Sequence, residues 1–233
     1  MDRLVHATEL YHDLEDGTLP SFSYLNPECC TVDSMYPTSN MAAGEQMVKH
    51  LYDALRRSKY CDNAAVPFPS PHANVLIINF DEHGGFVDHV PTPFNVTQPE
   101  DGIIFKGMSS NHNFPYDFTR MGVHVPAFIL SPWVPANLLI HDQGTMYAEN
   151  SAYTHSSILH FLQELWGLEG LKNRLQWAKT FEMAFTNKQR DDTHKKLAKP
   201  TWYGGSGQPE PEPFVLLNQD ESYYALRNAQ AKA

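Results

Sequence analysis

One short segment concentrates acidic and imidazole side chains directly after an apolar run. It spans residues 81–89 and reads Asp-Glu-His-Gly-Gly-Phe-Val-Asp-His. Two neighbouring carboxylates are costly unless a cation neutralises them, because each opposes the ionisation of the other, so Asp81 and Glu82 favour a divalent metal ion. Imidazole adds affinity for zinc, manganese or iron, and His89 returns towards the same place. The spacing alone leaves two interpretations open: a metal site or an ordinary solvated start of a loop.

The elements around this segment indicate how it would be positioned. Residues 74–80 are apolar and β-branched without alternation, which predicts a strand buried on both faces, as in a parallel sheet. Ligands of such sheets bind beyond the carboxyl ends of the strands. We therefore expect Asp81 and Glu82 at the end of a central strand, with both side chains facing one cavity. A second strand is predicted at residues 123–130, where Pro126 favours an edge position or a bulge.

Two amphipathic helices and one long loop complete the predicted order. Apolar residues recur at three- and four-residue steps over residues 43–58 and 154–166. Thr154 is a candidate N-cap for the second helix, and Gly167 a stop signal. Residues 91–118 are rich in Pro, Asn and Gly, and so long a loop favours a place beside a functional site. The order predicts an α/β domain.

Composition excludes several functional classes. The 233 residues carry 17 Lys and Arg against 27 Asp and Glu, and this net charge of −10 disfavours binding to nucleic acid. No apolar run has the length of a transmembrane segment, and the first residues lack the apolar region of a signal peptide. Three cysteines are too few for a disulfide scaffold, although one bridge from Cys61 to Cys29 or Cys30 stays open.

Residues 79–93 closely resemble the hallmark segment of the phosphoesterase family that contains bacterial and fungal phospholipases C and certain acid phosphatases. The resemblance covers roughly residues 10–185, and the fungal secreted branch is the most similar. Further matching segments lie at residues 17–27, 44–45, 122–133 and 153–157, and the fungal likeness rests on 28–30 and 165–177.

The resemblance implies roles for five residues. Asp81 and Glu82 match the paired acidic ligands of a divalent metal ion. His89 matches a family histidine near the phosphate, where an imidazole stabilises the departing group or donates a proton. His155 matches a histidine that opens a late helix, and a supporting role in the site and a structural contact are both open. Tyr36 stands where the family usually has histidine, and its hydroxyl can donate a hydrogen bond to phosphate.

The resemblance also implies a fold and a domain organisation. Members are similar to alkaline phosphatases, with a three-layer α/β/α arrangement around a central sheet. They carry an N-terminal half that begins near a Glu-Asn-Arg-Ser-Phe-Asp motif and supplies the nucleophile, and this motif does not occur here. We therefore expect residues 1–199 to be the C-terminal part of a phosphoesterase domain with an incomplete sheet, and residues 200–233 to be a strap and charged tail. An uncovered sheet edge would favour self-association.

The resulting functional hypothesis is a metal-assisted hydrolase of phosphoric ester bonds, of phospholipase C or acid phosphatase type. Its partners would be a phosphoester substrate, phospholipids included. The alternative is an inactive remnant that binds a metal or phosphate as an interaction domain. Since no nucleophile motif is recognised, hydrolysis by the chain alone is expected to be near background. Full-length relatives are expected to be secreted, whereas the sequence leaves the location of this chain unassigned.

Overall fold

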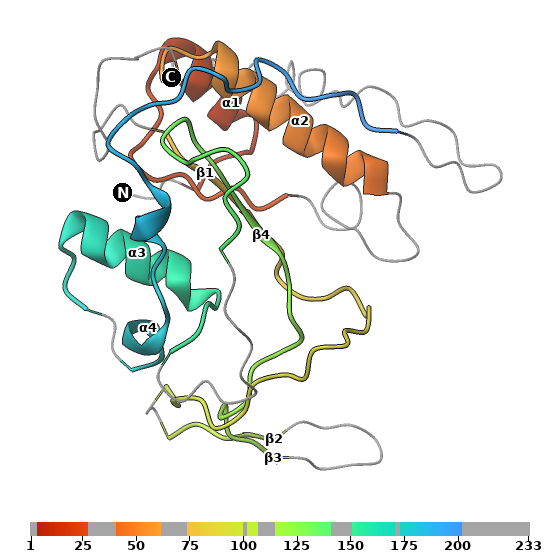
Figure 1. Cartoon of the computed structure of the whole chain (residues 1–233), viewed down its shortest axis with the longest axis vertical. Coiled ribbons are helices and arrows are strands. Elements are labelled where there is room, and N and C mark those ends of the chain that lie inside the picture. Colours follow the sequence, from red (N-terminus) through yellow and green to blue (C-terminus); the bar gives the residue numbers. More distant parts are fainter. Residues whose placement is uncertain are drawn as a thin grey trace, which may run out of the picture. The chain divides into compact units, whose positions relative to one another are not determined.

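The computed structural model describes residues 4–27, 41–61, 74–99, 102–106, 115–140, 151–170 and 173–201 (Figure 1). The chain divides into two compact units. The first takes Met1–Val66, Ser70–Asn74 and Asp192–Ala233, and the second takes Pro67–Pro69 and Val75–Asp191. The predictions for Tyr36, Cys29 and Cys30, and for nearly all of the tail after residue 199, lie outside the described residues. Cys61 is the one cysteine among the described residues, so its bridge to Cys29 or Cys30 stays a prediction.

The described residues of the first unit form two helices, α1 (Glu9–Asp16) and α2 (Met41–Arg57). Leu14 is the buried residue of α1, and its helix ends at Gly17, whose left-handed φ of 70° lets the backbone N–H bond back to the carbonyl of Asp13. The buried side of α2 includes Gly44, Met47 and Leu51, which are three and four residues apart, and this confirms the helix predicted at 43–58 with a slightly earlier start. The buried residues of this helix are Ala42, Gly44, Met47, Leu51 and Asp53.

Polar contacts from α2 hold a segment close to the end of the described chain. Lys49 donates from Nζ to the carbonyl of Leu197 (2.8 Å) and to Asp53 Oδ2 (2.6 Å). The backbone N–H of Leu197 donates to the other oxygen of Asp53 (3.1 Å). The Tyr52 hydroxyl donates to the carbonyl of His194 (2.6 Å). The carboxylate of Asp53 is therefore bonded on both oxygens.

Replacing Asp53 by Asn should destabilise this unit in a pH-dependent way. Burial alone would raise the pKa of Asp53, but the hydrogen bonds from Lys49 and from the backbone of Leu197 outweigh it and hold the pKa below its ordinary value. Because the folded-state pKa is depressed, the contribution is complete above the unfolded value of about 3.9 and is lost as pH falls through the folded value. We expect a loss of about 1–3 kcal/mol at pH 7, measured by urea unfolding.

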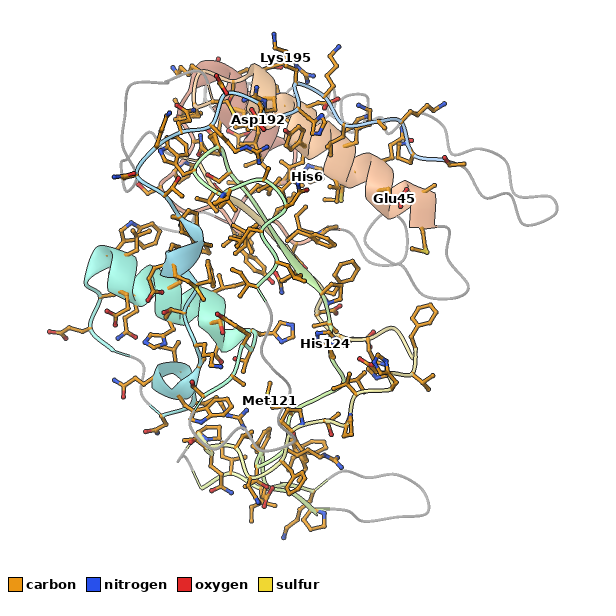
Figure 2. All side chains as sticks on the ribbon, viewed as in Figure 1. His6, Glu45, Met121, His124, Asp192 and Lys195 are labelled. Carbon is orange, nitrogen blue, oxygen red and sulfur yellow. The ribbon has the colours of Figure 1, made fainter. Side chains whose placement is uncertain are left out.

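The matched control is Glu45→Gln, which removes the same charge from an exposed position of the same helix. Figure 2 shows Glu45 near the start of α2, away from Lys195. The free energy of unfolding of this variant should stay within about 0.5 kcal/mol of the parent. Equal effects of the two substitutions at pH 7 would contradict the role given to Asp53.

In the part of the second unit that the structure describes, the strands form two small antiparallel sheets. Strands β1 (Leu76–Asn79) and β4 (Ala127–Leu130) pair with Leu76 opposite Leu130 and Asn79 opposite Ala127 (Figure 1). Strands β2 (Phe105–Lys106) and β3 (Pro115–Tyr116) form the other pair. These pairs and the helices confirm the mixed α/β class. The second strand is shorter than the predicted 123–130, because β4 begins only at Ala127, after Pro126, and proline cannot donate to a sheet ladder.

The parallel pairing expected for residues 74–80 is wrong, because β1 has an antiparallel partner. Leu76, Ile77 and Ile78 are only half-buried, and Phe128 of β4 is exposed. A run without alternation indicates that both faces of a strand are partly covered. Such a run carries no information about the direction of the neighbouring strand, and for this reason the parallel pairing was predicted wrongly.

Helix α3 (Ser156–Trp166) ends before Gly167 as its sequence predicts, and it begins after His155, one residue beyond the predicted cap Thr154. Thr154 Oγ1 accepts the backbone N–H of Ser156 (2.9 Å), and Ser157 Oγ accepts the backbone N–H of Thr154 (2.9 Å). The two side chains thus satisfy donors at the start of the helix reciprocally, as in a capping box. At the other end Gly167 has a left-handed φ of 60°, and its N–H bonds to the carbonyl of Gln163.

An aromatic cluster packs α3 against the segment that follows helix α4 (Arg174–Trp177). Phe161 is only 4% exposed. Its ring stacks on Phe181, with 4.5 Å between centroids, and on Phe185, with 5.5 Å. These two phenylalanines flank a short 3₁₀ helix, η1 (Glu182–Ala184). The cluster forms the core beneath α3.

The predicted loop at 91–118 is held to the rest of the second unit by Arg174. The guanidinium donates from Nε to the carbonyl of Thr97 (2.6 Å) and from Nη2 to the carbonyl of Phe118. It also lies over the ring of Trp177, 5.6 Å from the centroid.

Within the described part of the chain, no helix combines the length and the apolar character needed to cross a bilayer.

Candidate functional site

The two acidic residues follow β1 with one residue between them and the strand end. Asp81 Oδ1 accepts the backbone N–H of Glu82 (3.0 Å), and Glu82 Oε2 accepts that of Gly84 (2.7 Å). Both residues thus follow a strand as predicted, whereas β1 has one partner among the described strands, so its predicted central place in a sheet is not shown. Both side chains are exposed, so the expectation that they face an enclosed cavity finds no support among the described residues.

Two glycines turn the chain after Glu82. Gly84 and Gly85 both have left-handed backbones, with φ of 65° and 80°. A Cβ atom at Gly85 would meet nothing within 4 Å, so glycine is favoured there by conformation rather than by space. His83 closes the turn by donating from Nδ1 to the carbonyl of Phe86 (2.7 Å), and the Phe86 N–H donates to the carbonyl of His83 (3.0 Å). The turn carries the chain on to Asp88.

His155 lies at the same strand end as the acidic pair. Its Nε2 donates to the carbonyl of Phe80 at 2.6 Å, the residue that immediately precedes Asp81. The start of α3 is thereby attached to the end of β1, although 75 positions separate the two residues. Because this bond is made to the backbone, it supports the position of the strand end. The contact gives His155 a structural role next to Asp81.

A second cluster gathers around Asp88. His89 Nδ1 lies 3.2 Å from Asp88 Oδ1, and His124 Nδ1 lies 3.3 Å from Asp88 Oδ2. The N–H of Val90 also donates to Oδ1 (3.0 Å). This backbone bond, together with the two imidazoles, holds the pKa of Asp88 below its ordinary value against the opposing effect of partial desolvation. Among the described contacts, His89 is joined to Asp88 rather than to Asp81 or Glu82.

His124 is a candidate that sequence reasoning missed. Figure 2 shows it on the segment that leads into β4, beside the loop that follows β1. The antiparallel register explains its position: Ala127 pairs with Asn79, so a residue shortly before Ala127 falls opposite the residues that follow β1. The signal was a histidine inside the second predicted strand, at residues 123–130, two positions before Pro126. Its meaning depended on the strand direction, which was expected to be parallel.

The donor set limits the kind of metal ion that the described residues could hold. No group of three or more His, Cys, Asp or Glu side chains in the described ranges is placed to bind one ion. Structural and catalytic zinc sites need three or four protein ligands and do not fit Asp81 and Glu82 alone. Magnesium binds through one or two carboxylates and takes its other ligands from water and substrate phosphate, so this acidic pair fits such an ion.

Comparison with known proteins extends these observations. The family model described as Phosphoesterase family matches residues 2–169. Non-specific phospholipase C5 of Arabidopsis thaliana is 33% identical over 212 residues, which cover 86% of this chain and 37% of the relative. Non-specific phospholipase C1 of the same plant is 34% identical over 82% of this chain and 35% of its own length. The hemolytic phospholipase C of Pseudomonas aeruginosa is 27% identical, over 69% of this chain and 19% of its own length.

The chain thus spans less than two fifths of the length of these relatives. They come from a plant and a bacterium, so the likeness to a fungal branch and the assignment to a C-terminal half stay predictions. The family match includes both the acidic loop at residues 81–93 and His155, whose contact with Phe80 brings the two together. The chain belongs to the Phosphoesterase family.

Proposed function

We propose that this chain serves the hydrolysis of phosphoric ester bonds, with phospholipids as the substrate class. The observation that carries the proposal is the acidic pair Asp81 and Glu82 directly after β1, inside the segment that matches the family model. The relatives' names specify phospholipases C, which supports a phosphodiester substrate over a simple phosphate monoester.

The chemistry divides among the residues by their groups. Asp81 and Glu82 would hold a divalent cation, which when bound neutralises charge on the phosphoryl oxygens and favours attack on phosphorus. His89 would supply a proton to the departing oxygen from its exposed imidazole. His155 holds the strand end that presents the acidic pair. Tyr36, outside the described residues, remains a proposed hydrogen-bond donor to the phosphate.

Three broader features belong to the same proposal. We propose that β1 and β4 are part of a three-layer α/β/α sheet of alkaline-phosphatase type, and that the domain ends near residue 199. We also propose self-association, because the second unit exposes large apolar side chains. These include Phe86, Val87, Ile103, Ile104, Phe105 and Phe128.

The alternative function is that of a catalytically inactive domain that binds a metal or phosphate. One observation favours it: the described residues bring no third acidic or imidazole side chain to Asp81 and Glu82 in a metal-binding arrangement. The two functions differ in whether these carboxylates can support turnover. Binding of phosphate would be common to both.

A chimera separates the two functions. The 233-residue chain would replace the segment of non-specific phospholipase C5 that it matches, so that the relative provides the rest of its own sequence. We expect the chain alone to hydrolyse p-nitrophenylphosphorylcholine at near-background rates, since it shows no recognisable nucleophile motif. The chimera should exceed the chain alone by about a hundredfold or more, because a covalent nucleophile accounts for much of such catalysis.

The unsubstituted relative is the positive control, and circular dichroism with a cooperative thermal transition verifies that the chimera folds. A folded chimera with no more activity than the chain alone would favour the inactive binding domain. Saturable turnover by the chain alone would instead show that a nucleophile lies within its 233 residues.

A further inference from the structure

Asp88 joins two imidazoles that come from different parts of the second unit. One belongs to its neighbour His89 and the other to His124, on the segment before β4 (Figure 2). Each Nδ1 faces a different oxygen of the one carboxylate, at 3.2 Å and 3.3 Å. The arrangement therefore uses both oxygens of Asp88 and the same ring position of both histidines.

The orientation of the carboxylate does not depend on the imidazoles alone. The N–H of Val90 donates to Oδ1, which fixes the Asp88 side chain against its own loop. The left-handed backbones of Gly84 and Gly85 turn the chain just before this loop. Asp88 is thus held by backbone geometry in a position from which it can orient both rings.

The chemistry of the groups determines where the protons lie. An ionised carboxylate only accepts hydrogen bonds, so an imidazole nitrogen that faces it favourably must carry a proton. In a neutral ring with its proton on Nδ1, Nε2 has the lone pair. The Asp88 side chain is only 18% exposed, whereas those of His89 and His124 are 96% and 74% exposed. The carboxylate is thus mostly covered, whereas most of each ring is open to solvent.

We propose that Asp88 is a positioning residue that holds His89 and His124 as a pair of proton-transfer groups, each with Nδ1–H towards the carboxylate and Nε2 available to a phosphoester. The use of the pair on a phosphoester rests on the function proposed above, whereas the arrangement of protons does not. The proposal adds two residues to the site besides His89: His124 as the second imidazole and Asp88 as the carboxylate that orients both rings.

The proton balance of the step is simple. An attacking hydroxyl forms a bond to phosphorus and releases its proton to solvent. The bond between phosphorus and the leaving oxygen breaks, and its electron pair goes to that oxygen, which takes a proton from Nε2 of protonated His89. The neutral ring keeps its Nδ1–H on Asp88 and regains a proton from water. His124 donates from Nδ1 to the second oxygen of Asp88 and presents a second Nε2 of the same kind.

The test uses the full 233-residue chain with ¹⁵N-labelled histidine. Long-range ¹H–¹⁵N spectra at a pH where the rings are neutral report which nitrogen carries the proton. We expect mainly the Nδ1–H form for both His89 and His124. Asp88→Ala should shift both rings towards the Nε2–H form. Asp88→Asn, a milder change if the alanine variant fails to fold, should release at least one ring, because its amide has a single acceptor oxygen.

Asp117→Ala is the matched control. The Asp117 carboxylate accepts an N–H two residues ahead, from Thr119 at 3.1 Å, as Asp88 does from Val90, but its other bonded group is the Thr119 hydroxyl. This variant should leave the tautomers of His89 and His124 unchanged. Wild-type rings in the Nε2–H form, or rings that do not respond to either Asp88 variant, would overturn the inference.

Kinetics of the chimera separate this inference from the proposed function. Asp88→Ala should lower kcat by about tenfold to a hundredfold with little change in KM, the loss typical when a partner that orients a metal-ligating histidine is removed. An unchanged kcat would overturn the catalytic use of the pair. A folded but inactive parent chimera would refute the proposed function and with it that use, while the spectra would still decide whether Asp88 positions the two rings.

Discussion

Replacing Asp81 by Asn together with Glu82 by Gln should lower kcat/KM of the chimera by at least about a hundredfold. Loss of a single group that stabilises transition-state charge typically costs that much, and here two charges are removed. Both replacements keep the side-chain shape and an oxygen for the local bonds to Glu82 and Gly84 N–H groups. The loop should therefore remain folded while its charge is lost. Initial rates with p-nitrophenylphosphorylcholine measure the effect.

The control removes two carboxylates elsewhere in the same unit. Glu169 and Asp191 are both exposed, and the double variant Glu169→Gln with Asp191→Asn changes the net charge by the same amount. Its kcat/KM should stay within about twofold of the parent, because exposed charges away from the reacting atoms are strongly screened. If the two double variants lost activity equally, overall charge and not the acidic pair would account for the loss.

Phe161→Ala should lower the free energy of unfolding by about 3–5 kcal/mol, as large-to-small replacements of buried aromatic residues do. The ring is stacked on both Phe181 and Phe185, so its removal leaves a cavity bordered by two rings and also abolishes the stacking contacts. Urea unfolding followed by near-ultraviolet circular dichroism would measure the loss, because that signal reports aromatic packing.

Leu159→Ala is the comparison on the same helix, since Leu159 is 48% exposed. It removes an apolar side chain without opening a buried cavity, so its cost should be about 1 kcal/mol or less. Phe161→Leu should fall between the two, because it fills part of the space. A cost of Phe161→Ala no larger than that of Leu159→Ala would show that the aromatic cluster does not hold α3 in place.

The helices could be predicted because their signals are local. The spacing of Met47 and Leu51 marks the buried side of α2, and Thr154 and Gly167 mark the ends of α3. Each of these features depends on residues within a turn or two of the chain. The strands were located for the same reason, from the apolar runs at residues 74–80 and 123–130, although β4 occupies only the part of the second run that follows Pro126.

The pairing of the strands could not be predicted, because it depends on residues far apart in the sequence. The register that places Asn79 opposite Ala127 brings the segment before β4 next to the loop that follows β1. The apolar pattern of β1 is compatible with a parallel or an antiparallel partner. The residues of the candidate site divide in the same way into those that local sequence predicts and those that depend on strand pairing. Asp81 and Glu82 were found from one continuous segment, whereas the contact of His124 with Asp88 required the antiparallel pairing.

The hydrogen bonds between α2 and Leu197 also have a consequence for the order of events during synthesis. Lys49 and Leu197 are 148 positions apart, so the first unit cannot complete its contacts until Leu197 has left the ribosome. The second unit draws its described residues only from 75–191, so all of them emerge earlier. Closing a long loop also carries a larger entropic cost. The unit that holds the candidate site should therefore complete its fold on the nascent chain before the unit that contains α2 does.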